Sequence, residues 1–132
     1  MYITVSELGI PDQLLIKLTD DEGVGAVNIS RAESVITAAQ AIIDTALSRA
    51  YSVPFPDPPE IIKRLTADIA VYRLYQRAGI LTEEMRSVYE NAMVLLDKGA
   101  RSEVIIGSAA PGRGPEFSYQ ERELTREYME GL

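Results

Sequence analysis

The 132-residue chain contains no cysteine, no histidine and no tryptophan. Without cysteine it forms neither a disulfide nor a thiolate metal site. Without histidine it assembles neither a Ser-His-Asp nor a Cys-His nucleophile system, nor the usual zinc ligand sets. Catalysis would have to use Asp, Glu, Lys or Tyr, and no motif of these residues stands out. We therefore expect no enzyme activity, no catalytic residues, no cofactor and no resident metal.

Long apolar runs and an excess of basic residues are also missing. No run approaches the roughly 20 residues that a membrane-spanning helix needs, and the first residues lack the basic start and apolar centre of a signal peptide. We expect a cytosolic protein at synthesis without a membrane partner. The chain has 13 Lys and Arg against 20 Asp and Glu, a formal net charge of −7. Because phosphate binding depends on basic residues that displace counterions, we expect no sequence-specific nucleic-acid binding.

What is present is helical periodicity, beginning at Ile29. From there apolar residues recur every three or four positions, which predicts a helix over about residues 30–50 that begins with a capping box of Ser30 and Glu33. Four prolines within residues 54–59 follow this helix. Proline lacks a backbone donor and disfavours helical conformation in the residue before it, so this proline joint separates two core helices.

Two further long helices are predicted after the joint. The first has Asp57 as its N-cap and ends at Gly79, and its apolar residues cover most of its sides, which is typical of a central helix. The second follows Thr82 as N-cap, carries an apolar stripe, and ends at Lys98 and Gly99, where a cation and a glycine suit the C-terminal end.

The first 28 residues predict only short elements. Thr4-Val5-Ser6-Glu7 has capping-box spacing and Pro11 precedes a short apolar run, which indicates one or two brief helices. Asp20-Asp21-Glu22 and the glycines after it favour a turn. Acidic side chains also suit a hard cation, but an EF-hand loop ends with a glutamate where this chain has Ile29. A solvated turn is the preferred interpretation, and whether it binds a cation stays open.

The C-terminal part of the chain has a different composition. Residues 103–107 (Glu-Val-Ile-Ile-Gly) suit a short strand or hairpin, and the Gly/Pro/Ala-rich residues that follow suit a linker. The glycine spacing there resembles a phosphate-binding loop, but Arg113 replaces its lysine and Gly114 its Ser or Thr. The last segment has too few apolar residues for a core of its own, so it needs a partner surface.

These patterns together predict a mostly α protein. Its small helical bundle has three main helices and a short N-terminal helix and occupies residues 1–98. Residues 99–115 form a strand or linker, and residues 116–132 form an extended C-terminal arm.

Some residues are candidates for structural pins. Asp68 lies among apolar residues with Arg64 and Tyr72 one turn away on either side, and buried charges require partners. Tyr72, Tyr75 and Tyr89 recur at helical spacing without a basic groove, so core or interface positions are preferred over base stacking. The predicted pins are Arg49, Tyr51, Pro54, Asp68, Tyr72 and Arg73.

Several short segments occur in an order that is itself informative. They are Thr19-Asp20-Asp21, Ile42-Ile43-Asp44, Arg49-Ala50-Tyr51-Ser52-Val53-Pro54, Leu65-Thr66-Ala67-Asp68-Ile69-Ala70-Val71-Tyr72-Arg73-Leu74-Tyr75 and Leu124-Thr125-Arg126-Glu127-Tyr128-Met129-Glu130-Gly131-Leu132. Their order resembles that of the Mu-type tailed-bacteriophage head-tail connector or adaptor family, over residues 1–98 and more loosely at the end of the chain.

The resemblance implies a structural virion protein that is assembled in the host bacterial cytoplasm. In that family small helical subunits form a ring of about twelve copies between the portal protein and the head-closure or tail proteins, with DNA passing through the lumen. A monomer in isolation is compatible with this role. The arm is then expected to dock on an adjacent subunit or the portal through Phe117, Leu124, Arg126, Tyr128 and Leu132. The alternative is a helical protein–protein interaction module or regulator, with the arm as a partner-binding peptide.

Overall fold

The computed structural model describes residues 1–103 and consists of helices in that range, without a β-strand. A 3₁₀ helix, η1 (Val5–Leu8), precedes four α-helices: α1 (Asp12–Thr19), α2 (Ile29–Leu47), α3 (Glu60–Ala78) and α4 (Glu83–Ala100). The predicted mostly α bundle with three main helices is confirmed. Of the predicted strand or linker at residues 99–115, the structure describes only residues 99–103, of which the first two belong to α4; the predicted arm lies outside the described residues.

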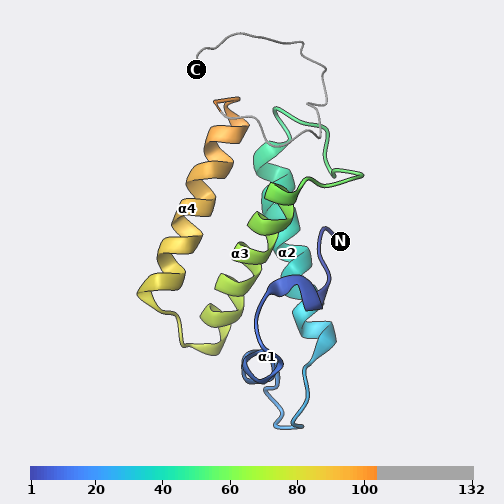
Figure 1. Ribbon diagram of the computed structural model, residues 1–132, viewed down its shortest axis with the longest axis vertical. Helices are drawn as coiled ribbons and strands as arrows, with labels where there is room; N and C mark the ends of the chain where they lie inside the picture. The colour runs from blue at the N-terminus through green and yellow to red at the C-terminus, as the bar shows by residue number, and fades with distance from the viewer. Residues whose placement is uncertain (104–132) are drawn as a thin grey trace.

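Helix α3 is the centre of the bundle. It contacts every other helix of the described chain, whereas α4 contacts only α2 and α3. Figure 1 shows α3 between α2 and α4, with α1 across one end. The proline joint connects α2 to α3 and a short turn connects α3 to α4, so consecutive long helices run antiparallel. The central position that its apolar composition predicts for α3 is confirmed.

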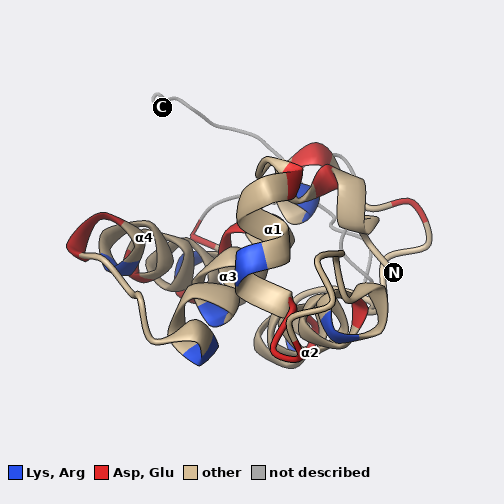
Figure 2. Cartoon of the chain, turned by 90° about the horizontal axis from the view of Figure 1, so that it is seen from below, with Lys and Arg blue, Asp and Glu red and all other residues tan. Residues whose placement is uncertain are grey.

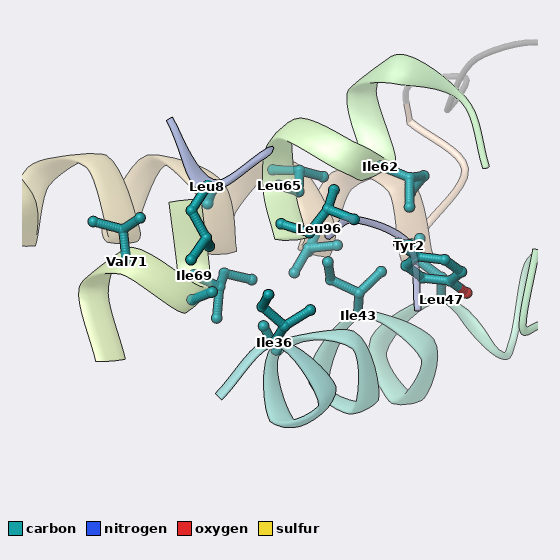
Figure 3. Close-up of a cluster of buried hydrophobic side chains, with 14 of the residues drawn as sticks. Tyr2, Leu8, Ile36, Ile43, Leu47, Ile62, Leu65, Ile69, Val71 and Leu96 are labelled. Carbon is teal, nitrogen blue, oxygen red and sulfur yellow. The ribbon is translucent and has the colours of Figure 1, made fainter. Parts of the chain in front are cut away.

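The core follows the predicted periodicity. In α2 the buried residues recur at three- and four-residue spacing, and α3 buries residues on several sides (Figure 3). Two buried threonines satisfy their hydroxyl groups within their own helices: Thr19 donates to the carbonyl of Leu15 at 2.8 Å and Thr66 to that of Ile62 at 2.7 Å. Both polar groups are therefore buried without losing a hydrogen bond.

Two predicted helix starts are wrong by a short distance. The N-cap of α2 is Asn28, not Ser30, because the Asn28 side chain already accepts a hydrogen bond from the Arg31 backbone N–H at 2.9 Å. The N-cap position of α3 is Pro59, not Asp57. Since a proline disfavours helical conformation in the residue before it, Pro59 prevents the helix from starting earlier.

Other helix ends are as predicted, with two exceptions. Gly79 ends α3 with a φ of 75°, a left-handed conformation that favours glycine, and the Thr82 side chain accepts the Met85 N–H at 3.1 Å at the start of α4. Helix α2 ends at Leu47, three residues earlier than Ala50. Helix α4 continues past Gly99, which is buried within it. None of the helices in residues 1–103 combines the length and the apolar run required to cross a bilayer.

Candidate functional site

Tyr2 joins the N-terminus to α2 and to the proline joint. Its side chain is 5% exposed. The hydroxyl donates a short hydrogen bond to Asp44 of α2 and accepts one from the Phe55 backbone N–H at 2.9 Å. Its own backbone N–H donates to the Gln40 side chain at 2.9 Å. Residue 2 is therefore bound to two segments that lie far away in the sequence.

Three aromatic rings complete this contact. The ring centroid of Phe55 lies 6.1 Å from that of Tyr2 and 5.9 Å from that of Tyr51. All three side chains are buried. We call Tyr2, Asp44, Tyr51 and Phe55 the aromatic clasp. The clasp fixes the proline joint against α2, so it sets where α3 begins.

Burial, reinforced by the hydrogen bond to Asp44, raises the pKa of Tyr2 to about 12 from an ordinary value of 10.0. A raised pKa means that the folded protein favours the protonated hydroxyl. This contribution to stability is complete below pH 10.0 and is lost as the pH rises toward about 12. The Tyr2 hydroxyl is therefore protonated at neutral pH, as its hydrogen bond to Asp44 requires.

The clasp contains one predicted pin and three residues that sequence reasoning missed as site residues. Tyr51 was predicted, whereas Tyr2, Asp44 and Phe55 were not. Two other predicted pins, Arg49 and Pro54, lie exposed at the joint beside the clasp. Phe55 could have been predicted from the sequence, because it is an aromatic residue within a proline-rich joint and its large apolar ring favours burial.

The acidic turn after α1 is held by backbone donors and by two arginines. Asp20 accepts from the N–H groups of Val24 and Gly25 at 2.9 and 2.7 Å, and Gly25 has a φ of 88°, where residues other than glycine are strained. Asp21 lies 2.6 Å from the guanidinium of Arg77, near the end of α3. These contacts hold the turn closed and tie it to α3.

Arg31 makes the second tie, to the start of α2. Its guanidinium lies 3.2 Å from Glu22 and donates to the carbonyl of Thr19 at 2.6 Å. The acidic side chains thus face N–H donors instead of converging on one point. Within residues 1–103, no group of three or more His, Cys, Asp or Glu side chains is arranged to hold a metal ion. The turn therefore connects the C-terminal end of α1 to the N-terminal end of α2 and to the C-terminal end of α3.

The contacts lower all three carboxyl pKa values. The hydrogen bonds from the backbone of Gly25 and Val24 lower the pKa of Asp20, that from Arg77 lowers the pKa of Asp21, and that from Arg31 lowers the pKa of Glu22. A lowered pKa adds stability above the ordinary values of 3.8 and 4.5, and this stability is lost as the pH falls through the lower folded values.

Acid unfolding tests the tie between the turn and α3. We expect Arg77→Met to lower the Tm at neutral pH, and we expect the difference from the unmodified chain to shrink below the ordinary Asp pKa of 3.8. Lys17→Met, which removes an exposed cation from α1, serves as the matched control. A Tm difference for Arg77→Met that is constant from neutral to acid pH would show that the ion pair is not its cause.

The remaining predicted pins lie on α3, and they differ in their contacts. Tyr72 stacks on Tyr89 of α4, with ring centroids 3.9 Å apart and an interplanar angle of 13°. Asp68, half-buried one turn earlier, makes no hydrogen bond or ion pair with any residue in the range 1–103, so the expected pairing with Arg64, Tyr72 or Arg73 is not observed there. Burial raises the pKa of Asp68 and the charge of Arg64 opposes this shift.

The charged residues are dispersed. Figure 2 shows Lys and Arg positions as well as Asp and Glu positions along the helices. The predicted arm residues Phe117, Leu124, Arg126, Tyr128 and Leu132 lie outside the described part of the chain.

Comparison with known protein families identifies the group to which most of the chain is similar. The model of the family described as "Bacteriophage Mu, Gp36" matches residues 2–122, which is most of the chain. The matched range includes the aromatic clasp, the acidic turn and all four α-helices. No curated protein matches the chain.

Proposed function

Because the chain belongs to the bacteriophage Mu Gp36 family, we propose that it is a structural protein of the virion, a head-to-tail connector or adaptor subunit. Copies of it form a ring of about twelve between the portal protein and the head-closure or tail proteins. DNA passes through the lumen of this ring. Assembly takes place in the host bacterial cytoplasm, and the isolated chain is a monomer or a ring.

The observation that carries this proposal, besides the family, is the incomplete burial of α4. This helix fully buries only Ala92, Leu96 and Gly99. The neighbouring apolar residues of the predicted stripe are half-buried, and Val94 is 54% exposed. A ring needs heterologous contacts, in which one patch of a subunit meets a different patch of the next. An apolar helix at the edge of the bundle supplies one such patch.

The charge of the chain also supports the proposal. A net charge of −7 makes a ring of these subunits strongly acidic. Acidic surfaces repel DNA, so DNA moves through the lumen without binding to its wall. An interaction module or regulator has no comparable need for this charge.

Size measurement and imaging test the proposal directly. We expect light scattering and electron microscopy of the full chain, alone or mixed with the portal protein of the same phage, to show rings of about twelve copies. A helical interaction module instead stays monomeric or dimeric and leaves the portal unoccupied. A chain that binds no portal and forms no ring at any concentration contradicts the connector function.

A further inference from the structure

The side of the bundle between α3 and α4 carries an unusual set of half-buried groups. We call Asp68 and Tyr72 of α3, with Tyr89 and Met93 of α4, the α3–α4 surface. The Tyr72–Tyr89 stack fixes the register of the two antiparallel helices. Asp68 lies one turn before Tyr72 in α3, and Met93 lies one turn after Tyr89 in α4. Because the two helices are antiparallel, these two residues are at the same level. A carboxylate therefore lies beside a stacked aromatic pair and a thioether.

The Asp68 carboxylate lacks a direct cationic partner among residues 1–103. Arg64, one turn away on the same helix, acts on it only through its charge. Removing a carboxylate from water without pairing it costs free energy, and that cost is offset when a cation arrives. The surface is suited to a partner that brings a guanidinium or ammonium group together with apolar side chains.

The chain itself supplies such a partner. Helix α4 ends at Ala100, and three residues of turn connect this end of the bundle to residues 104–132. In the arm, Arg126 stands between Leu124 and Tyr128, so a cation and two large side chains occur within five positions. Arg126 has one adjacent glutamate, Glu127, whereas the other arm arginine, Arg122, stands between two, Glu121 and Glu123, which oppose its charge more strongly. Charge complementarity therefore favours Arg126 as the partner of Asp68.

The length of the chain outside the bundle permits contact with a second copy. At about 3.3 Å per residue, the twelve residues from 104 to 115 span at most about 40 Å. A 19-residue helix such as α3 is about 28 Å long at 1.5 Å per residue, so this span exceeds the length of the bundle's own helices. The arm can thus leave its own bundle and reach the next subunit.

We propose that the arm of one copy binds the α3–α4 surface of the next copy, with Arg126 paired to Asp68. Leu124 and Tyr128 then cover the Tyr72–Tyr89 stack and Met93. This inference rests on the proposed connector function, to which it adds the partner and the site of the arm. The arm is one half of the heterologous contact that a ring requires, and the α3–α4 surface is the other half.

Disulfide trapping tests the contact, because the natural chain has no cysteine. One full-length variant carries Met93→Cys and a second carries Leu124→Cys. After the two are mixed over a series of concentrations and oxidised, we expect a disulfide that joins residue 93 of one copy to residue 124 of another. Thr45→Cys, at an exposed position of α2, replaces Met93→Cys in the matched control and is expected to give little of this product.

The outcomes separate the possible positions of the arm. A 93–124 disulfide no more abundant than the control at every concentration overturns the proposal. So does a chain carrying both substitutions that forms the bond only within itself, because the arm then covers the surface of its own copy. Mass spectrometry of the linked peptides distinguishes the mixed disulfide from links between identical residues.

Charge reversal tests the Asp68–Arg126 pair. We expect Asp68→Arg or Arg126→Asp to reduce the trapped product about fivefold, the scale of a partly exposed ion pair. Combining the two in one chain restores it. Arg122→Asp makes the same charge change in the arm and is expected to have little effect. Circular dichroism confirms folding, and Asp68→Asn replaces Asp68→Arg if the arginine variant unfolds. Equal losses for Arg122→Asp and Arg126→Asp, without restoration, overturn the pairing.

Failure of this inference and failure of the connector function give different results. If the full chain forms rings or binds the portal but yields no 93–124 disulfide, the function stands and the arm docks elsewhere. If the disulfide forms between copies but neither rings nor portal attachment is seen, the docking stands and the connector function falls.

Discussion

Replacing Tyr2 by alanine is expected to lower the free energy of unfolding by about 4 kcal/mol, a large part of the stability of a domain of this size. The substitution removes a ring that is 5% exposed and packs on Phe55. It also leaves the Asp44 carboxylate and the Phe55 N–H without the hydroxyl that joins them. Chemical denaturation measures the loss, and hydrogen exchange at Phe55 reports on the joint itself.

A matched pair of hydroxyl deletions separates the ring from its hydrogen bonds. Tyr2→Phe keeps the ring and is expected to cost about 1–3 kcal/mol, because the half-buried Asp44 carboxylate and the buried Phe55 N–H lose their partner. Tyr75→Phe removes a hydroxyl that makes no hydrogen bond within residues 1–103, and is expected to change stability by less than about 0.5 kcal/mol. If the two variants are equally stable, the Tyr2 hydroxyl does not hold the clasp.

The clasp also shows which part of the structure the sequence could not predict. The periodicity of α2 and α3 is local, so residues three and four positions apart revealed their buried faces. The hydrogen bonds of Tyr2 join residues 42 and 53 positions apart in the chain. No spacing rule connects such residues, because their proximity depends on how the whole bundle packs.

The ion pairs of the acidic turn could likewise be predicted only in part from the sequence. The sequence predicted a turn at Asp20-Asp21-Glu22, and the local hydrogen bonds of Asp20 agree with this. It did not predict Arg77 as the partner of Asp21, since that residue lies 56 positions later. The position of Arg77 beside the turn follows from the packing of α1 on α3.

Helix α4 gives the most useful disagreement. Its stripe from Met85 to Leu96 was predicted as a regular apolar face, but only Ala92 and Leu96 of that stripe are buried. A short bundle has too little partner surface to cover a helix at its edge, and an apolar stripe does not reveal whether its partner is in the same chain. The apolar residues of the stripe that the bundle does not cover are suited to a contact between copies.

Removal of residues 116–132 is expected to leave the bundle intact and to abolish the joining of capsids to tails. The clasp, the acidic turn and the core described above are built by residues 1–103, so the free energy of unfolding should change by less than about 0.5 kcal/mol. Light scattering, electron microscopy with the portal, and in vitro joining of heads to tails measure the assembly. The Arg122→Asp full-length chain is the control for a charge change without loss of the arm.

The two measurements on the truncated chain give opposite information. Normal assembly of a folded truncated chain contradicts a role of the arm in joining subunits. A truncated chain that unfolds instead shows that the arm belongs to the bundle of its own copy, as a stabilising part of the core. Docking of the arm on the partly exposed α4 of the next copy is supported only if the truncated chain folds and no longer assembles. In that case docking of the arm is coupled to assembly, and the contact between copies offsets the entropy lost on docking.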